Sequence, residues 1–389
     1  MSEWKEYKLG ELIETNVKSI DKNYPYSKIL YLDTGSITCN RVESYQEFEI
    51  DKAPSRAKRL VKQDDIIYSS VRPNQLHYGY ITNPQDNLVV STGFVTISCN
   101  KEKLHPKFLY YYLTQSYITE YLHSVAEAST SAYPSLKPSD IEALDIEIPI
   151  HDDQCRIASI LTSLDDKIDL LRCENATLEA MAETLFRQWF VEDAKKEWEE
   201  GKVADFSKHI KDSINPQRYP NTVFQHFSIP AYDDGKKPII ETGGDIQSNK
   251  YVIPQNCILF SKLNPHKDKR VWLILDDVPD NAICSTEFQI VKPINVYYLF
   301  FLYGWLTYKD NYEDIASGVG GTSGSHQRID PKSIFSYACP NVDNETIRNY
   351  SEDVEPLFKK QINNQKQIQT LIQTRDMLLP RLMSGEIKI

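Results

Sequence analysis

Residues that could do chemistry are scattered through this 389-residue chain, and none of them completes a catalytic pattern. A methyltransferase acting on amino nitrogens needs Asn or Asp followed by two prolines and an aromatic residue, together with a glycine-rich cofactor turn. Three Asn-Pro pairs lack the second proline, namely Asn83-Pro84, Asn215-Pro216 and Asn264-Pro265. We therefore expect no catalytic residues.

Nucleotide, nuclease and metal sites are disfavoured in the same way. The glycine-rich run 318–324 has no Gly-Lys-Ser/Thr and precedes a turn instead of a helix, unlike a phosphate loop. Pro279-Asp280 followed by Glu287-Phe288-Gln289 puts Gln where a common metal-dependent nuclease needs Lys. The eight His and seven Cys show no ligand spacing. We expect no metal.

Two basic segments could instead contact phosphate groups, although the formal net charge of −11 opposes simple DNA binding. The first segment holds Lys52, Arg56, Lys58, Arg59 and Lys62 without an acid between them, and the second holds Lys262, Lys267, Lys269 and Arg270 around Asp268. Each could form a cationic edge on an acidic domain. Taken alone, each segment is equally compatible with an ordinary solvated loop.

Targeting signals are not evident. Met1 to Leu9 alternates charged and apolar residues, unlike a secretory signal, and the apolar run 296–306 is shorter than the ~20 residues that cross a bilayer. The cysteines are typical of reduced, buried thiols. These features predict a cytoplasmic protein without a membrane segment.

The chain repeats itself once, at an offset of about 193 residues, which is close to half its length. Matching segments keep the same order in both halves. They include Trp4, Lys8, Leu9, Glu11 and Leu12 with Trp198, Lys202, Val203, Asp205 and Phe206; 65–69 with 257–261; 91–94 with 285–288; and 136–138 with 329–331. The repeat predicts two copies of one unit, each a globular segment followed by a helix.

The helical segments have the heptad spacing of a coiled coil, and the register is the same in both. The first runs from Ile157 to Trp189 and the second from Tyr350 to Leu382, so the two seams should pair with each other. Asn175, Gln361 and Asn364 would set the register at some cost in stability. A plain helical bundle is the alternative for either helix alone. The predicted seam consists of Leu161, Leu164, Ile168, Leu171, Asn175, Leu178, Leu185, Val354, Leu357, Asn364, Ile368, Leu371 and Leu378.

The globular halves are predicted to be α+β. Strand-like runs at 65–71, 88–98, 257–263 and 271–275 accompany one aromatic helix in each half, 106–122 or 294–312. Phe108, Tyr111 and Tyr112, like their counterparts in the second half, are more typical of a core than of a base-stacking surface. The predicted fold class is two globular α+β domains joined by two long helices.

Four motifs together resemble the type I restriction-modification specificity (S) subunits, and the resemblance covers the whole chain. The motifs are WKEYKLGEL from Trp4 to Leu12, LDDKIDLL from Leu164 to Leu171, LFRQWF from Leu185 to Phe190 and LLPRLMSGEI from Leu378 to Ile387. The resemblance implies target-recognition domains at 1–150 and 196–340, each reading one half of a split DNA site. It also implies antiparallel coiled-coil helices at 151–195 and 341–389 that hold the domains apart.

The same resemblance implies the partners. They are double-stranded DNA, two modification (methyltransferase) subunits and restriction (translocase/endonuclease) subunits, with no membrane. The chain itself would be non-catalytic, and S-adenosylmethionine, ATP and Mg²⁺ would be held by partner subunits only. The net charge then ceases to be an objection, because the modification subunits would supply much of the phosphate contact.

Two loops in each half are the best candidates for contact with DNA. Arg and Lys suit guanine, Asn suits adenine, and short hydroxyls suit phosphate. The loop after the 65–71 or 257–263 strand gives Ser70, Arg72, Asn74, Lys262, Asn264, His266, Lys269 and Arg270. The loop before Pro138 or Pro331 gives Thr130, Ser131, Tyr133, Ser135, Thr322, Ser323, Ser325, His326, Gln327 and Arg328, and the first basic segment adds Lys58 and Arg59.

A different class of protein also fits the repeat and the helices. A two-domain coiled-coil scaffold that binds proteins and no DNA would need the same architecture. Sequence-specific retention of DNA by the assembled complex would separate the two hypotheses.

Overall fold

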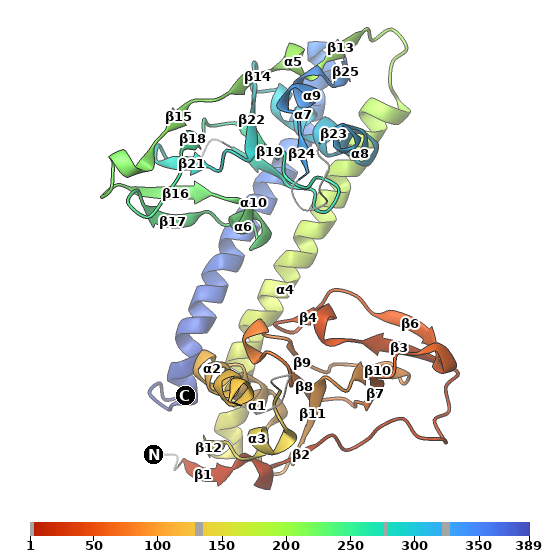
Figure 1. Cartoon of the computed structure of the whole chain (residues 1–389), viewed down its shortest axis with the longest axis vertical. Helices are drawn as coiled ribbons and strands as arrows, with labels where there is room; N and C mark the ends of the chain where they lie inside the picture. Colours follow the sequence, from red (N-terminus) through yellow and green to blue (C-terminus); the bar gives the residue numbers. More distant parts are fainter. Residues whose placement is uncertain (1–3, 129–134, 276–277, 321–326) are drawn as a thin grey trace. The chain divides into compact units, whose positions relative to one another are not determined.

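The computed structural model describes residues 4–128, 135–275, 278–320 and 327–389, and the chain forms two compact units (Figure 1). Unit 1 is Met1–Leu170 with Gln367–Ile389, and unit 2 is Leu171–Lys366. Each unit combines one globular half with a stretch of both long helices, α4 (His151–Arg187) and α10 (Asn344–Met383). No described helix is both long and apolar enough to cross a membrane.

Strands and short helices alternate through both globular halves. Besides the long helices, unit 1 contains β1 (Lys5–Lys8), β2 (Ile13–Thr15), β3 (Lys28–Leu32), β4 (Ile37–Thr38), β5 (Arg41–Val42), β6 (Gln46–Glu49), β7 (Ala57–Leu60), β8 (Ile66–Ser69), β9 (Tyr78–Tyr80), β10 (Leu88–Ser91), β11 (Phe94–Cys99), α1 (Pro106–Leu113), α2 (Ser116–Glu127), α3 (Pro138–Glu142) and β12 (Asp145–Ile148). Unit 2 contains β13 (Glu200–Lys202), α5 (Val203–Phe206), β14 (Ser207–Ile210), β15 (Ser213–Ile214), β16 (Val223–Phe227), α6 (Ile229–Asp233), β17 (Ile239–Thr242), β18 (Lys250–Val252), β19 (Cys257–Ser261), β20 (Val271–Ile274), β21 (Ala282–Cys284), β22 (Phe288–Pro293), α7 (Tyr298–Thr307), α8 (Lys309–Ser317), β23 (Val319–Gly320), β24 (Arg328–Ile329), α9 (Pro331–Ser336) and β25 (Ala338–Pro340).

Strand order confirms the internal repeat and the α+β class. The sheet β2-β11-β8-β9 in unit 1 has the same order as β14-β22-β19-β20 in unit 2. The second sheet is β6-β3-β10-β7 in unit 1, and unit 2 matches it with β17-β16-β21-β18 plus the extra edge strand β15. In both, the central pair is parallel, β3 with β10 and β16 with β21. Each unit also closes its first strand onto its last, β1 on β12 and β13 on β25.

Three predicted elements are each divided in the structure. The strand predicted at 88–98 is β10 and β11, because a turn at Thr92-Gly93, in which Gly93 N donates to Ser91 Oγ at 3.1 Å, moves the chain from one sheet to the other. The helix predicted at 106–122 is α1 and α2, since Gln115 is extended (φ −62°, ψ 141°) and its buried amide donates to the Tyr112 carbonyl. Tyr308 (ψ 133°) separates α7 from α8 in the same way.

The core of each unit lies between its repeated sheet and its helices. In unit 1, β8, β11 and the helices α1, α2 and α3 enclose an apolar cluster to which α4 adds Ile157 and Leu161 and α10 adds Leu382. The prediction that the aromatic helix is a core element is confirmed, since Phe108 is 0% exposed. Unit 2 is built alike around the fully buried Phe260 and Phe301.

Within each unit the two long helices pack antiparallel, as predicted. In unit 2, Asn175 of α4 meets Asn364 of α10, whereas the later residue Phe190 meets the earlier residue Tyr350. In unit 1, Asp165 and Arg375 form an ion pair of 2.8 Å. Every predicted seam residue is buried or half-buried, so the heptad pattern corresponds to the packed faces.

Candidate DNA interface

The two candidate loops of each half meet in space, and the same backbone hydrogen bonds join them in both units. In unit 1, Ser70 N donates to the Gly93 carbonyl at 2.8 Å and Leu136 N donates to the Ser70 carbonyl at 2.8 Å. In unit 2, Lys262 N donates to the Glu287 carbonyl at 3.0 Å and Ile329 N to the Lys262 carbonyl at 2.9 Å. Antiparallel bridges, Val71 with Ser135 and Leu263 with Arg328, complete each joint.

A left-handed residue stands at the same place in both loops. Arg72 and Asn264 each have φ of +47°, and each precedes a proline that is buried. A side chain with a Cβ rarely adopts this conformation, and arginine has less tendency to do so than asparagine. Strained backbone of this kind persists where the surrounding structure holds it, and it is concentrated at functional sites. The two units therefore hold corresponding residues, Arg72 and Asn264, in one unusual geometry.

In unit 1 the joint positions Ser70, Gly93 and Ser135 carry no charge, and the basic side chains lie beside them. Arg72 and Asn74 are exposed, whereas Ser70, whose Oγ donates to the Gly93 carbonyl at 2.9 Å, and Ser135 are half-buried. The basic segment reaches the same turn, because Thr92 N donates to the Arg56 carbonyl at 2.8 Å.

Lys58 and Arg59 of this basic segment lie on β7 and differ in access. Lys58 is exposed and has its backbone carbonyl bonded by Ile20 N. Arg59 is half-buried and donates to Ser19 Oγ at 3.5 Å. Lys58 is therefore the more accessible of the two for a phosphate group.

The candidate surface of unit 2 carries an ionic cluster at the joint. The Glu287 carboxylate accepts from Arg328 Nη2 at 3.0 Å and from Arg328 Nε at 3.1 Å, and it lies 4.0 Å from Lys262 Nζ. Hydrogen bonding to this carboxylate raises the pKa of Arg328. Gln327 contributes its carbonyl to Asn264 N at 2.8 Å, and His266 is exposed.

Arg270 differs from the other candidates because its side chain is occupied within unit 2. Its guanidinium, 10% exposed, bonds Asp233 at 2.6 and 2.8 Å and Asp268 at 2.7 Å. The hydrogen bonds that Arg270 donates to the Asp233 carboxylate raise the pKa of Arg270. This geometry gives Arg270 a structural role in holding its loop, and its guanidinium has little surface left for contact with DNA.

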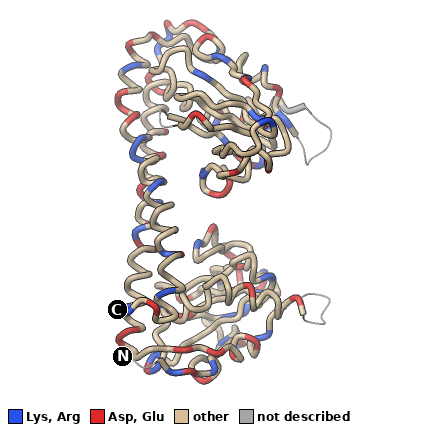
Figure 2. The backbone as a smooth tube through the Cα atoms, turned by 90° about the vertical axis from the view of Figure 1, so that its left-hand side faces the viewer, with Lys and Arg blue, Asp and Glu red and all other residues tan. Residues whose placement is uncertain are grey.

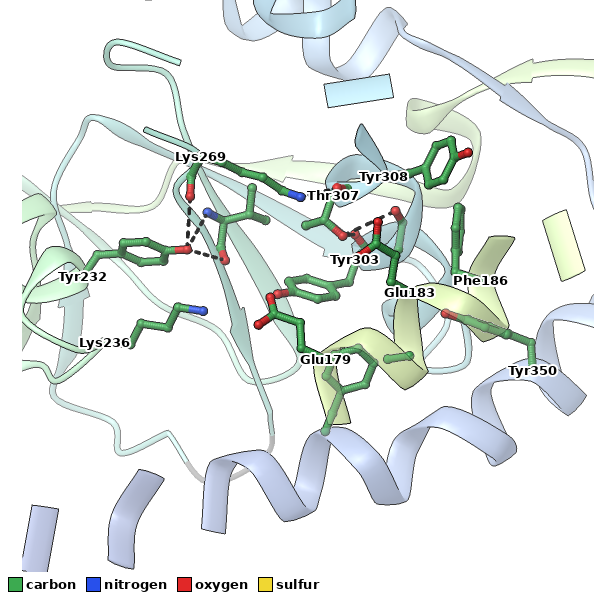
Figure 3. A pocket seen from close by; sticks show the side chains of 14 residues that line it. Glu179, Glu183, Phe186, Tyr232, Lys236, Lys269, Tyr303, Thr307, Tyr308 and Tyr350 are labelled. Atoms are coloured by element: carbon green, nitrogen blue, oxygen red, sulfur yellow. Dashed lines mark hydrogen bonds between the residues drawn. The ribbon is translucent and has the colours of Figure 1, made fainter. Parts of the chain in front are cut away.

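Lys269 points into a cavity of about 130 Å³ in unit 2 (Figure 3). Its ammonium donates to the Thr307 carbonyl, and Glu179 and Glu183 of α4 line the same cavity. Burial lowers the pKa of Lys269, and the nearby Glu183 carboxylate opposes that shift. Lys269 is exposed as a residue, but its ammonium is engaged at the junction between its loop and the helices, away from Arg328 and Lys262 on the candidate surface.

Seven candidates, Thr130, Ser131, Tyr133, Thr322, Ser323, Ser325 and His326, lie outside the described residues. Within the described residues, no three His, Cys, Asp or Glu side chains come close enough to hold a metal. Along the backbone, Lys and Arg are interspersed with Asp and Glu (Figure 2).

The sequence analysis did not identify Glu287 as part of this surface. Residues 91–94 and 285–288 match except for Gly93 against Glu287 in their third position. That single difference was the available signal, and only the structure shows that it falls between Lys262 and Arg328.

Comparison with known proteins gives a consistent result. A family model described as the type I restriction modification DNA specificity domain matches residues 1–180. The type I restriction enzyme HindI specificity subunit of Haemophilus influenzae is 35% identical over 192 residues, 49% of this chain and 42% of that protein. The type I restriction enzyme MjaIX specificity subunit of Methanocaldococcus jannaschii is 26% identical over 363 residues, 85% of this chain and 79% of that protein.

A crystal structure of a type I restriction-modification S subunit from M. genitalium shares the fold. It superposes with a TM-score of 0.60 over 98% of this chain and 96% of that one, at 16% identity. The match to the first relative spans less than half of that protein, so this relative alone covers only part of the architecture. Residues 1–180 thus match the type I restriction modification DNA specificity domain, and the chain is similar to type I restriction enzyme specificity subunits along most of its length.

Proposed function

We propose that this chain reads the DNA sequence for a type I restriction-modification complex, with each unit reading one half of a split target. One observation carries the proposal. Both units build the same two-loop joint, and each joint holds a left-handed residue next to exposed polar side chains. A scaffold that bound only proteins would have no need for two such joints.

The chemistry of the joints suits base edges. Arg72 and Asn264 share one backbone geometry but carry different side chains. The exposed arginine matches guanine O6 and N7, whereas the Oδ1 atom of Asn264 is buried and is not offered to a base. Two copies with different side chains would read two different half-sites. Exposed Lys58 and the adjacent backbone groups would serve phosphate contacts, which position the protein without reading sequence.

The remaining functions belong to partners in this proposal. The chain would join two modification subunits, and restriction subunits would complete the complex. S-adenosylmethionine, ATP and Mg²⁺ would be bound by those subunits. Because the chain is acidic overall, with a net charge of −11, the modification subunits would also supply much of the phosphate contact.

The test is to map methylated adenines in host DNA with and without this gene. A split motif that appears only with the gene supports the proposal. In parallel, the reconstituted complex is challenged with random DNA duplexes in a gel-shift assay. Retention without any sequence preference, together with an unchanged methylation pattern, would favour the protein-binding scaffold instead.

A further inference from the structure

The turn that supports each joint is the same in both units except for one side chain. It reads Ser91-Thr92-Gly93 in unit 1 and Ser285-Thr286-Glu287 in unit 2. In both, the third residue donates its N–H to the serine Oγ, at 3.1 and 3.3 Å, and gives its carbonyl to the candidate loop. Since Gly93 supports the joint with no side chain, the carboxylate of Glu287 is not needed to form the turn.

Glu287 instead engages two cations of the candidate surface. Both of its oxygens accept from the Arg328 fork, and Lys262 Nζ is 4.0 Å away. The side chains of Lys262, Glu287 and Arg328 are 22%, 24% and 48% exposed. The corresponding positions of unit 1, Ser70, Gly93 and Ser135, carry no charge. The ionic cluster is thus a feature of one unit, added to a joint that forms without it.

Stability gives little reason for such a cluster. Ion pairs with this much exposure contribute little to stability on average, because solvent screens them and side-chain entropy opposes them. Binding gives a better reason. A guanidinium already held on two bonds loses less conformational freedom when its remaining N–H groups bind a base edge. The carboxylate also repels phosphates, which disfavours contacts outside the correct register.

We propose that Glu287 is a positioning residue that sets specificity in the half-site read by unit 2. It holds Arg328 so that the free edge of the guanidinium reads a base, and it keeps Lys262 and Arg328 from binding phosphates without regard to sequence. Guanine is the base that this arrangement fits, because its O6 and N7 accept from an arginine. The inference rests on the proposed function and assigns a role to one residue of the unit 2 joint.

The experiment uses the complex reconstituted with its modification subunits. Glu287→Gln removes the charge, and Glu287→Gly copies the turn of unit 1. Both variants should lower the discrimination between the correct and the wrong base at one position of one half-site by roughly 5- to 150-fold. The other half-site should be read unchanged. At the same time, affinity for random duplex should rise, and the slope of log K against log salt should steepen by about 0.9 for each phosphate gained.

Two further variants separate this role from others. Asp212→Asn removes one exposed carboxylate from the β14–β15 loop of the same unit, so it controls for net charge and should leave the motif intact. Arg328→Lys keeps the charge but loses the fork, so it should relax the same base as Glu287→Gln without steepening the salt slope.

Opposite outcomes overturn the proposal. Weaker binding to all duplexes with an unchanged motif would mean that Glu287 only supports the loop. A Glu287→Gln variant that prefers a new base, while Arg328→Lys keeps the original base, would mean that Glu287 reads the base itself. Failure of the parent function looks different, because the wild-type complex would then show no split motif at all.

Discussion

Asn364 of α10 donates from Nδ2 to Oδ1 of Asn175 of α4 at 2.9 Å, at a position where Asn364 is 0% exposed. The same nitrogen donates to Glu174 Oε2 at 2.9 Å, and Gln361 Nε2 donates to the Asn175 carbonyl at 3.1 Å. A buried amide pair costs stability compared with leucine but restricts the helices to one register. Unit 2 therefore has a polar group at the centre of an otherwise apolar seam.

Changing this pair should separate stability from register. Asn364→Ala should lower the free energy of unfolding by about 1–3 kcal/mol, because it removes a partner from the Asn175 amide. Replacing both asparagines with leucine should restore or exceed wild-type stability while permitting other pairings. Denaturant unfolding gives the first quantity, and light scattering of the double variant detects new oligomers. A double variant less stable than Asn364→Ala would contradict the argument.

Domain exchange should change half of the target. Residues 1–150 contain one joint and residues 196–340 contain the other, and each joint is built by contacts within its own unit. Replacing one of these segments with that of a relative should therefore alter only one half of the methylated motif. Sequencing of methylated DNA is the readout, with the unmodified chain as the control. A change in both halves would show that the units do not read independently.

Substitutions of Arg72 and of Lys58 should affect DNA binding in different ways. Arg72→Ala should cost about 1–3 kcal/mol at one base position and relax that position alone, because an arginine fork discriminates among bases. Arg72→Gly is the control for backbone strain, since glycine accepts a φ of +47° at no cost. Both variants should relax the same position.

Lys58→Ala should weaken all duplexes about equally and reduce the salt slope by about one, because an exposed lysine contacts phosphates. Binding measured over a range of salt concentrations distinguishes the two patterns. A base-specific effect of Lys58→Ala would place that residue at a base edge instead.

Arg270 should contribute to the stability of unit 2 and not to recognition of the DNA sequence. Its guanidinium is 10% exposed between Asp233 and Asp268, which are themselves 47% and 39% exposed. Arg270→Ala should thus lower the free energy of unfolding by about 1–3 kcal/mol, below the cost of breaking a fully buried pair. The methylation motif of the surviving protein should stay the same. A relaxed motif at unchanged stability would return Arg270 to the interface.

Acid should destabilise unit 2 through His209. This ring stacks on Phe335 with centroids 4.5 Å apart, and burial, helped by nearby Lys211, lowers the pKa of His209 below 6.5. The unfolded chain therefore binds a proton at a higher pH than the folded one, so stability is lost as the pH falls below about 6.5. His209→Phe keeps the stacking and should flatten this part of the stability curve. An unchanged pH dependence would rule the residue out as its source.

The architecture was predictable because the sequence contains an internal repeat. Trp4 to Leu12 and Trp198 to Phe206 match without a gap, and the structure uses both to close equivalent sheets. The heptad seam was equally visible, since apolar spacing depends only on local periodicity. What the pattern missed were breaks such as Gln115, where one buried amide ends a helix that the aromatic residues alone would continue.

The site was harder to predict because the roles of charged residues depend on their partners. Lys269, Arg270 and Arg328 look alike in sequence, yet one donates to a carbonyl, one is clamped by two aspartates and one is held by Glu287. Asp268 is only two residues from Arg270, but Thr307, Asp233 and Glu287 lie 38, 37 and 41 residues from the cations that they bind, at separations that local patterns do not encode. The left-handed backbone of Arg72 has no local signal either, because arginine seldom adopts it.

Unit 1 takes part of its core from residues 367–389, which follow the whole of unit 2 in the chain. Leu379, Leu382 and Met383 pack against the same apolar cluster as Leu9 and Phe108. All residues of unit 2 are therefore synthesised before residues 367–389, which complete the core of unit 1. Residues 1–170 are synthesised first, and their apolar cluster stays partly exposed until residues 367–389 have been made. Nascent chains should depend on chaperones during that interval, and domains that normally fold in order of synthesis should here be completed in the reverse order.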